Sequence, residues 1–292
     1  MLCLRATKGN TMGNLKLRRR RTALAAGLAT LAMAVGLAVV PAQAAEKTKY
    51  IALGDSYAAG QGAGPYLDSC YRSDNTYSEL AADDKAIKLV TNAACSGKTT
   101  QEVVATQLRQ LNRSTELVTI TAGGNNLGFG EIVTNCGTAI FDSAFAAACA
   151  DASATAKAKL LSGQLAGDVA SMIQSVQAAA PNAKIVVTGY PYLFDPIPAG
   201  RTDSMSQFIY RATDLARGLN DSIAVAAAAI DPTALRVNYV DVRTAFAGHG
   251  ILSNDPWING AVPDSPDGFH PNAKGYVAYF TALSSAGAYS AP

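Results

Sequence analysis

The 292-residue sequence contains few of the residues that bind structural metals. It has only two histidines, His249 and His270, and no C-x-x-C motif. A structural zinc site needs four Cys or His ligands, which commonly come in closely spaced pairs. The composition therefore argues against a zinc-binding domain. A reaction that needs a histidine base has only these two residues to draw on.

Positive charge is also scarce beyond the N-terminus. Seven of the 24 Lys and Arg residues lie within residues 1–44, which leaves 17 against 22 Asp and Glu residues and a net charge of −5. Nucleic-acid binding requires clustered Lys and Arg side chains that neutralise phosphates. We therefore expect no nucleic-acid partner.

Residues 1–44 have the layout of a secretory signal peptide. Four arginines at 18–21 precede an uncharged apolar stretch over 23–40, and Ala42-Gln43-Ala44 follows. A basic start, an apolar centre and an A-x-A site are typical of a cleaved leader. The alternative is a membrane anchor, although this stretch is near the lower length limit for a span. We expect cleavage near Ala44, export by the general or the twin-arginine route, and an extracellular mature protein.

Residues 45–292 have a length that suits a single domain. Four cysteines remain in this part, at positions 70, 95, 136 and 149. An even number of cysteines in an exported chain indicates two disulfides. Four cysteines allow three pairings, and proximity along the chain favours Cys70–Cys95 with Cys136–Cys149.

Short apolar segments alternate with longer helical segments along residues 45–292. The short segments are apolar almost throughout, as the central strands of a parallel sheet are. Strands are expected at 50–53, 87–91, 117–121, 185–188 and 237–242. Helices are expected at 76–83, 99–111, 152–180, 204–230 and 273–284. Residues 128–150 contain two cysteines and are expected to form short helices or a loop held by a disulfide. The alternation predicts a three-layer α/β/α sandwich around a five-stranded, mostly parallel sheet.

Small and polar residues follow three of these strands, and the carboxyl ends of parallel strands gather at one edge of a sheet. Ser56 of Gly54-Asp55-Ser56 lies where a strand ends, a position that gives a nucleophile rigid support. Gly97 offers an unencumbered backbone N–H, and Asn125 offers a neutral side-chain amide. Both are donors suited to an oxyanion. Taken singly, each feature is more often an ordinary turn or helix cap.

A further candidate block, Asp267-Gly268-Phe269-His270-Pro271, lies near the C-terminus. Pro271 suits the first position of a helix, so His270 is expected in the loop before it. A tight turn would bring the Asp267 carboxylate onto Nδ1 of His270 and orient the ring as a base. That carboxylate would raise the pKa of His270 above its usual value of about 6.5. His249, the other candidate base, has no such upstream carboxylate.

Together, the four blocks resemble those of the SGNH, or GDSL-type, hydrolases over the whole mature length. Ser56, Gly97, Asn125 and His270 match the four residues that name the family. Secreted actinobacterial lipases and esterases are the members that the chain resembles most. The resemblance implies a flavodoxin-like SGNH fold, a Ser56–His270–Asp267 triad, and an oxyanion hole formed by Ser56, Gly97 and Asn125. It implies no metal or organic cofactor.

Two residues depart from the family pattern: Tyr57 replaces Leu, and Asn126 replaces an Asp that often follows the catalytic Asn. The Gly97-Lys98-Thr99 triplet is not a phosphate-binding loop, because that motif requires glycine where Asn92 stands. The resemblance implies an esterase or lipase acting on acyl lipids or simple acyl esters. A phospholipase, a carbohydrate acetylesterase and an inactive secreted binding domain are alternatives. We expect a monomer with at most transient contact with lipid surfaces.

Overall fold

The computed structural model describes residues 46–261 and 265–290. The signal peptide expected over residues 1–44 lies outside them and stays a prediction. Among the described residues, no helix is both long enough and apolar enough to cross a membrane.

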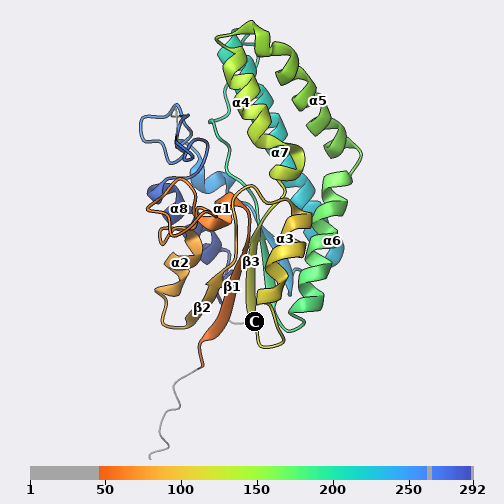
Figure 1. The fold of residues 1–292 in the computed structure, drawn as a ribbon, viewed down its shortest axis with the longest axis vertical. Coiled ribbons are helices and arrows are strands. Elements are labelled where there is room, and N and C mark those ends of the chain that lie inside the picture. The colour runs from red at the N-terminus through yellow and green to blue at the C-terminus, as the bar shows by residue number, and fades with distance from the viewer. Residues whose placement is uncertain (1–45, 262–264, 291–292) are drawn as a thin grey trace, which may run out of the picture. The chain divides into compact units, whose positions relative to one another are not determined.

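Five strands form one parallel sheet in the order β2-β1-β3-β4-β5 (Figure 1). The strands are β1 (Thr48–Gly54), β2 (Ile87–Asn92), β3 (Leu117–Thr121), β4 (Lys184–Thr188) and β5 (Val237–Val240). All five expected strands are confirmed, and their ends move by at most two residues. Every residue of β3 is buried, which explains why this segment is mostly apolar and carries no charged residue.

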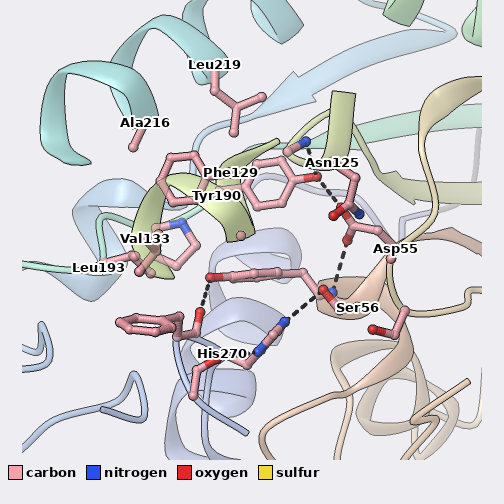
Figure 2. Close-up of a pocket in the computed structure, with 18 of the residues that line it drawn as sticks. Asp55, Ser56, Asn125, Phe129, Val133, Tyr190, Leu193, Ala216, Leu219 and His270 are labelled. Atoms are coloured by element: carbon pink, nitrogen blue, oxygen red, sulfur yellow. Dashed lines mark hydrogen bonds between the residues drawn. The ribbon is translucent and has the colours of Figure 1, made fainter. Parts of the chain in front are cut away.

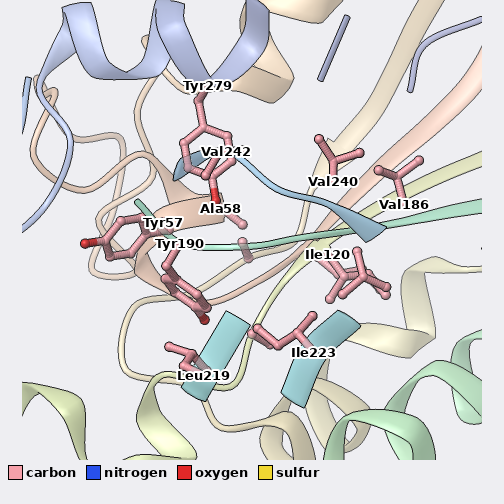
Figure 3. Packing of buried hydrophobic residues seen from close by; sticks show 14 of the residues in the cluster. Tyr57, Ala58, Ile120, Val186, Tyr190, Leu219, Ile223, Val240, Val242 and Tyr279 are labelled. Carbon is pink, nitrogen blue, oxygen red and sulfur yellow. The ribbon is translucent and has the colours of Figure 1, made fainter. Parts of the chain in front are cut away.

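Helices cover both faces of the sheet, which confirms the three-layer α/β/α fold (Figure 1). On one face α2 (Tyr77–Ala82) contacts α8 (Ala273–Ser285). On the other face α6 (Gln164–Ala179) contacts both α3 (Thr100–Gln107) and α7 (Ser204–Ile230). Figure 3 shows the core between these layers, with Tyr279 of α8 on one side of the strands and Leu219 and Ile223 of α7 on the other.

The segment between β3 and α6 differs from the expected arrangement. It forms a hairpin of α4 (Phe129–Ala139) and α5 (Ala146–Leu161), joined through the 3-10 helix Ser143–Phe145. The single helix expected over 152–180 is therefore wrong. Gly163, with a φ of 74°, separates α5 from α6. Glycine adopts this left-handed conformation without the steric penalty of a Cβ, so it ends one helix and lets the chain change direction.

Two disulfides link loops and helices around the sheet. Cys70–Cys95 joins the segment before α2 to the segment after β2, and Cys136–Cys149 joins α4 to α5. These are the two pairings that proximity along the chain favoured. The remaining elements are α1 (Ser56–Ala59) and the 3-10 helices Leu108–Gln110, Asn125–Leu127 and Arg243–Phe246.

The strand order determines where a site can form. From the centre of the sheet the chain runs outward to β2 in one direction and through β4 to β5 in the other. The crevice at this reversal lies outside the carboxyl ends of β1 and β3, where ligands of open α/β sheets bind. Ser56 directly follows β1, and Asn125 follows β3, so both lie beside this crevice.

Candidate active site

The Ser56 hydroxyl has a rigid support behind it. Ser56 is the first residue of α1, and Gly54 ends β1 two residues earlier. Gly54 has a φ of 133°, and a Cβ there would lie 2.1 Å from the carbonyl oxygen of Thr121. Only glycine lets the ends of β1 and β3 approach so closely. The Gln107 side chain bonds both the N–H and the carbonyl of Gly54, each at 2.8 Å, which fixes the backbone before the serine.

The His270 ring connects this serine to a backbone carbonyl. Its Nε2 lies 2.8 Å from Ser56 Oγ, and its Nδ1 lies 2.8 Å from the carbonyl oxygen of Gly268 (Figure 2). A carbonyl oxygen can only accept, so Nδ1 carries the proton and Nε2 is left to accept from the serine. This is the arrangement of a nucleophile with an oriented general base.

The loop that carries His270 is held by residues far away in the sequence. Phe269 has a φ of 65°, a left-handed conformation that is unusual for a bulky residue. The Tyr57 hydroxyl donates to the Phe269 carbonyl at 2.6 Å. The Asn259 N–H donates to the His270 carbonyl at 2.9 Å, and its carbonyl accepts from the Phe269 N–H at 2.9 Å. These bonds maintain the turn that aims the imidazole at Ser56.

The expected bond between Asp267 and His270 is wrong. The Asp267 carboxylate accepts a hydrogen bond from the Tyr66 hydroxyl, while the Gly268 carbonyl lies at Nδ1. The left-handed turn at Phe269 directs this carbonyl back onto the ring two residues later. The carbonyl therefore occupies the position at which the carboxylate was expected, and Asp267 acts on His270 only through its charge.

The pKa of His270 is lowered to about 4, opposite to the direction expected from the sequence. Burial of the ring is the main cause, because desolvation disfavours the charged imidazolium. The Gly268 hydrogen bond and the Asp267 charge oppose this shift without overcoming it. The ring is therefore neutral, and able to accept a proton, at neutral pH.

This shift predicts the acid limb of the pH profile. A base must be unprotonated, so we expect kcat/KM to rise with pH through a midpoint near 4. The rate should then be level from about pH 6, two units above that pKa. Stopped assays with a soluble ester between pH 3 and 8 measure the profile, with circular dichroism at each pH as a control for folding. A midpoint near 6.5 in the folded protein would contradict the burial argument.

Three potential hydrogen-bond donors to an oxyanion line the same pocket as Ser56 and His270. Within the described residues, neither the Ser56 N–H nor the Gly97 N–H donates to a protein acceptor. Gly97 has a φ of 79°, a conformation that favours glycine. The Asn125 amide donates to the Lys98 carbonyl at 3.0 Å, which orients the side chain and leaves its second N–H available.

A buried network beside the nucleophile was not found from the sequence. The Tyr190 hydroxyl donates to the Asp55 carboxylate at 2.5 Å and accepts from the Gly124 N–H at 3.2 Å. Burial raises the pKa of Asp55 to about 7. The network joins the segments that follow β1, β3 and β4. In the sequence, Asp55 is marked only by its place next to Ser56. Nothing in the residue spacing connects Asp55 to Tyr190, so the network could not be predicted.

Asn126, one of the departures from the family pattern, anchors the start of α3. Its side-chain oxygen accepts from the Thr100 N–H at 3.0 Å, and its amide donates to the Thr100 hydroxyl at 2.8 Å.

His249, the other candidate base, lies outside the pocket that contains Ser56 and His270. Its ring stacks on Trp257 with centroids 3.4 Å apart, and it is not among the residues that line the pocket.

The pocket itself has a polar end and an apolar end, with a cavity volume of about 280 Å³. Ser56 and His270 lie at the polar end. Side chains from α4, the β4–α7 loop and α7 line the apolar end (Figure 2); among them are Phe129, Val133, Leu193, Ala216 and Leu219. Among the described residues, no group of three or more His, Cys, Asp or Glu side chains is placed to hold a metal ion. The arrangement suits a substrate with a reactive polar group and an apolar chain.

Comparison with known proteins places these features in context. Residues 52–278 match the family model of the GDSL-like lipase/acylhydrolase family. The chain is 33% identical over 288 residues to the protein named Lipase from Streptomyces rimosus, covering 93% of this chain and 100% of the relative. It is 34% identical over 268 residues to Lipase 1 from Streptomyces coelicolor, covering 88% of this chain and 95% of the relative.

Two solved structures share the fold over nearly their whole length. The extracellular lipase from Streptomyces rimosus aligns with a TM-score of 0.73 at 33% identity, covering 82% of this chain and 99% of that one. Phospholipase A1 from Streptomyces albidoflavus aligns with a TM-score of 0.69 at 36% identity, with the same coverage of 82% and 99%.

Proposed function

The chain belongs to the GDSL-like lipase/acylhydrolase family and is a carboxylic ester hydrolase, and we propose that it is a secreted esterase or lipase that acts through Ser56 and His270. The observation that carries this proposal is the 2.8 Å contact between Ser56 Oγ and His270 Nε2, at the polar end of a pocket whose other end is apolar. The His270–Gly268 bond supports it, because it leaves Nε2 as the acceptor.

In the proposed reaction, Ser56 Oγ attacks the ester carbonyl while His270 Nε2 takes the hydroxyl proton. The N–H groups of Ser56 and Gly97 and the amide of Asn125 stabilise the oxyanion that forms. His270 then gives its proton to the departing alkoxide, which leaves as the alcohol. Water repeats the sequence on the acyl-enzyme, with His270 as its base, and releases the carboxylic acid and free Ser56.

Gly268 takes the orienting role for which Asp267 was expected. A neutral carbonyl accepts the Nδ1 proton and stabilises the imidazolium less strongly than a carboxylate would. The nearby Asp267 charge adds to that stabilisation through space, because it favours the protonated ring. We therefore describe the catalytic unit as a Ser56–His270 pair oriented by a backbone carbonyl.

The apolar end of the pocket would hold the acyl chain of the substrate. Ala216 and Leu219, from α7, and Val133, from α4, line this end. The limited cavity favours short to medium acyl chains. The phospholipase A1 relative supports a phospholipid as the second candidate substrate, since a phospholipid presents the same acyl ester to the pocket.

Enlarging Ala216 should shorten the preferred acyl chain. We expect Ala216→Phe to lower kcat/KM for p-nitrophenyl octanoate by about 10-fold to 200-fold, because about two to four methylenes lose burial at about 0.8 kcal/mol each. The value for p-nitrophenyl acetate should change little. Leu219→Ala is the matched control. It enlarges the same end of the pocket, so kcat/KM for p-nitrophenyl octanoate should be retained. Equal losses on both esters in Ala216→Phe would contradict this assignment of the acyl site.

Two experiments test the proposed function. A panel of p-nitrophenyl esters, phospholipids and acetylated sugars distinguishes an esterase or lipase from a phospholipase or a carbohydrate acetylesterase. A fluorophosphonate probe should label Ser56 in the folded protein, as read by peptide mass spectrometry, and should not label Ser56→Ala. If the probe left the folded parent unlabelled, an inactive binding domain would be favoured instead.

The proposed secretion rests on the leader and on the two disulfides. Disulfides form and persist in oxidising compartments outside the cytosol. Export with cleavage near Ala44 would release a chain that starts near Ala45, which N-terminal sequencing of the secreted protein measures. We propose that this mature form is a monomer.

A further inference from the structure

The α4–α5 hairpin connects the pocket to an exposed apolar surface. At its start α4 lines the pocket through Phe129 and Val133. From there α4 runs away from the sheet beyond the carboxyl ends of the strands, and α5 returns beside it (Figure 1). The far end of this hairpin consists of residues 141–148, which we call the hairpin tip. It lies beyond the same sheet edge as the candidate active site.

All eight residues of the hairpin tip are exposed, and six of them are Phe or Ala. Phe141 is 86% exposed, and Phe145 is 39% exposed. Asp142 is the only charged residue of the tip, and its carboxylate accepts the N–H of Ala144. Isolated exposed apolar residues are normal, but two exposed phenyl rings within a stretch that has a single charged residue mark a contact surface.

The hairpin tip is held in place by local structure. Cys136 and Cys149 join α4 to α5 just below it. The 3-10 helix Ser143–Phe145 spans its centre, with Asp142 as the N-cap. The phenyl rings of Phe141 and Phe145 are therefore presented by a braced hairpin.

We propose that the hairpin tip docks onto the uncharged surface of an aggregated acyl ester and so brings the pocket to its substrate. This inference rests on the proposed function, since it assigns a binding surface to the same hydrolase. Aromatic side chains enter the boundary between water and acyl chains readily. The tip carries no Lys or Arg that would favour an anionic surface. Its lack of positive charge therefore matches a neutral ester.

The test compares an aggregated ester with a dissolved ester. The variant Phe141→Ser/Phe145→Ser should bind trioctanoin emulsion droplets at least tenfold more weakly in a flotation assay, and should hydrolyse the emulsion correspondingly more slowly. Its kcat/KM for dissolved p-nitrophenyl acetate should stay within twofold of the parent. Flotation is measured in a Ser56→Ala background so that no substrate is consumed, and thermal melts compare the folding of the variants.

Leu235→Ser is the matched control. Leu235 is 76% exposed and lies between α7 and β5, at the opposite edge of the sheet from the candidate active site. Its replacement should leave both binding and hydrolysis of the emulsion unchanged. Unaltered emulsion binding by the double Phe variant would overturn the proposal. A parent dimer in sedimentation that the double Phe variant abolishes would also overturn it, because it would assign the tip to a second copy of the chain. A parent that binds droplets through the tip but hydrolyses no dissolved ester would support the docking surface and contradict the proposed function.

Discussion

Replacing Ser56 or His270 by alanine should lower kcat for a soluble p-nitrophenyl ester by about 10⁴- to 10⁶-fold. Each replacement removes one end of the 2.8 Å contact between Ser56 Oγ and His270 Nε2. The double variant should lose little more than either single variant, because the two residues act in the same steps. Steady-state kinetics on the purified variants, with melting curves to compare folding, measure these losses.

His249→Ala is the matched control for the loss of a histidine. His249 stacks on Trp257 and lies outside the residues that line the pocket, so kcat should change less than tenfold. If His249→Ala abolished turnover in a folded protein while His270→Ala retained it, the assignment of the base would be wrong. Asp267→Asn should also have a small effect, since Gly268 rather than Asp267 bonds Nδ1.

Asn125→Ala should produce the second largest loss, with kcat lower by about 10²- to 10³-fold and KM little changed. The Asn125 amide is oriented by its bond to the Lys98 carbonyl and lines the pocket beside Ser56. A donor that acts on the developing oxyanion stabilises the transition state more than the bound ester, so its loss lowers kcat. Separate determination of kcat and KM for one soluble ester makes the comparison.

Asn126→Ala is the neighbouring control for this prediction. Asn126 bonds Thr100 at the start of α3, and we expect its replacement to lower the melting temperature more than kcat. If Asn125→Ala raised KM and left kcat intact, Asn125 would be a residue that binds the ground-state ester and not an oxyanion donor.

The sequence determined the sheet because buried parallel strands are apolar on both faces, a property that local composition records. It also determined α7, whose observed bounds of Ser204–Ile230 equal the expected ones, since an Asp203 cap precedes a long helical stretch. The sequence did not predict the division between α5 and α6, for which a single helix was expected. The break signal, Ser162-Gly163, was present in the chain, but the surrounding Ala-rich sequence favours a helix on both sides.

Four of the candidate site residues could be assembled from the sequence for a topological reason. Ser56, Gly97 and Asn125 each follow a strand, and His270 precedes α8, so a parallel sheet brings all four to one edge. This argument needs only the order of the elements. It does not extend to the direction in which an individual side chain or carbonyl points.

What orients His270 was decided only by the tertiary structure. Bonds from Tyr57 and Asn259 maintain the left-handed turn at Phe269, and this turn presents the Gly268 carbonyl to the ring in place of Asp267. The pKa of His270 has the same origin, because burial depends on residues from distant parts of the chain. Spacing along a sequence shows which groups can reach one another. Which of two competing acceptors reaches the ring, and how much water remains around it, depends on contacts that form only when the chain has folded.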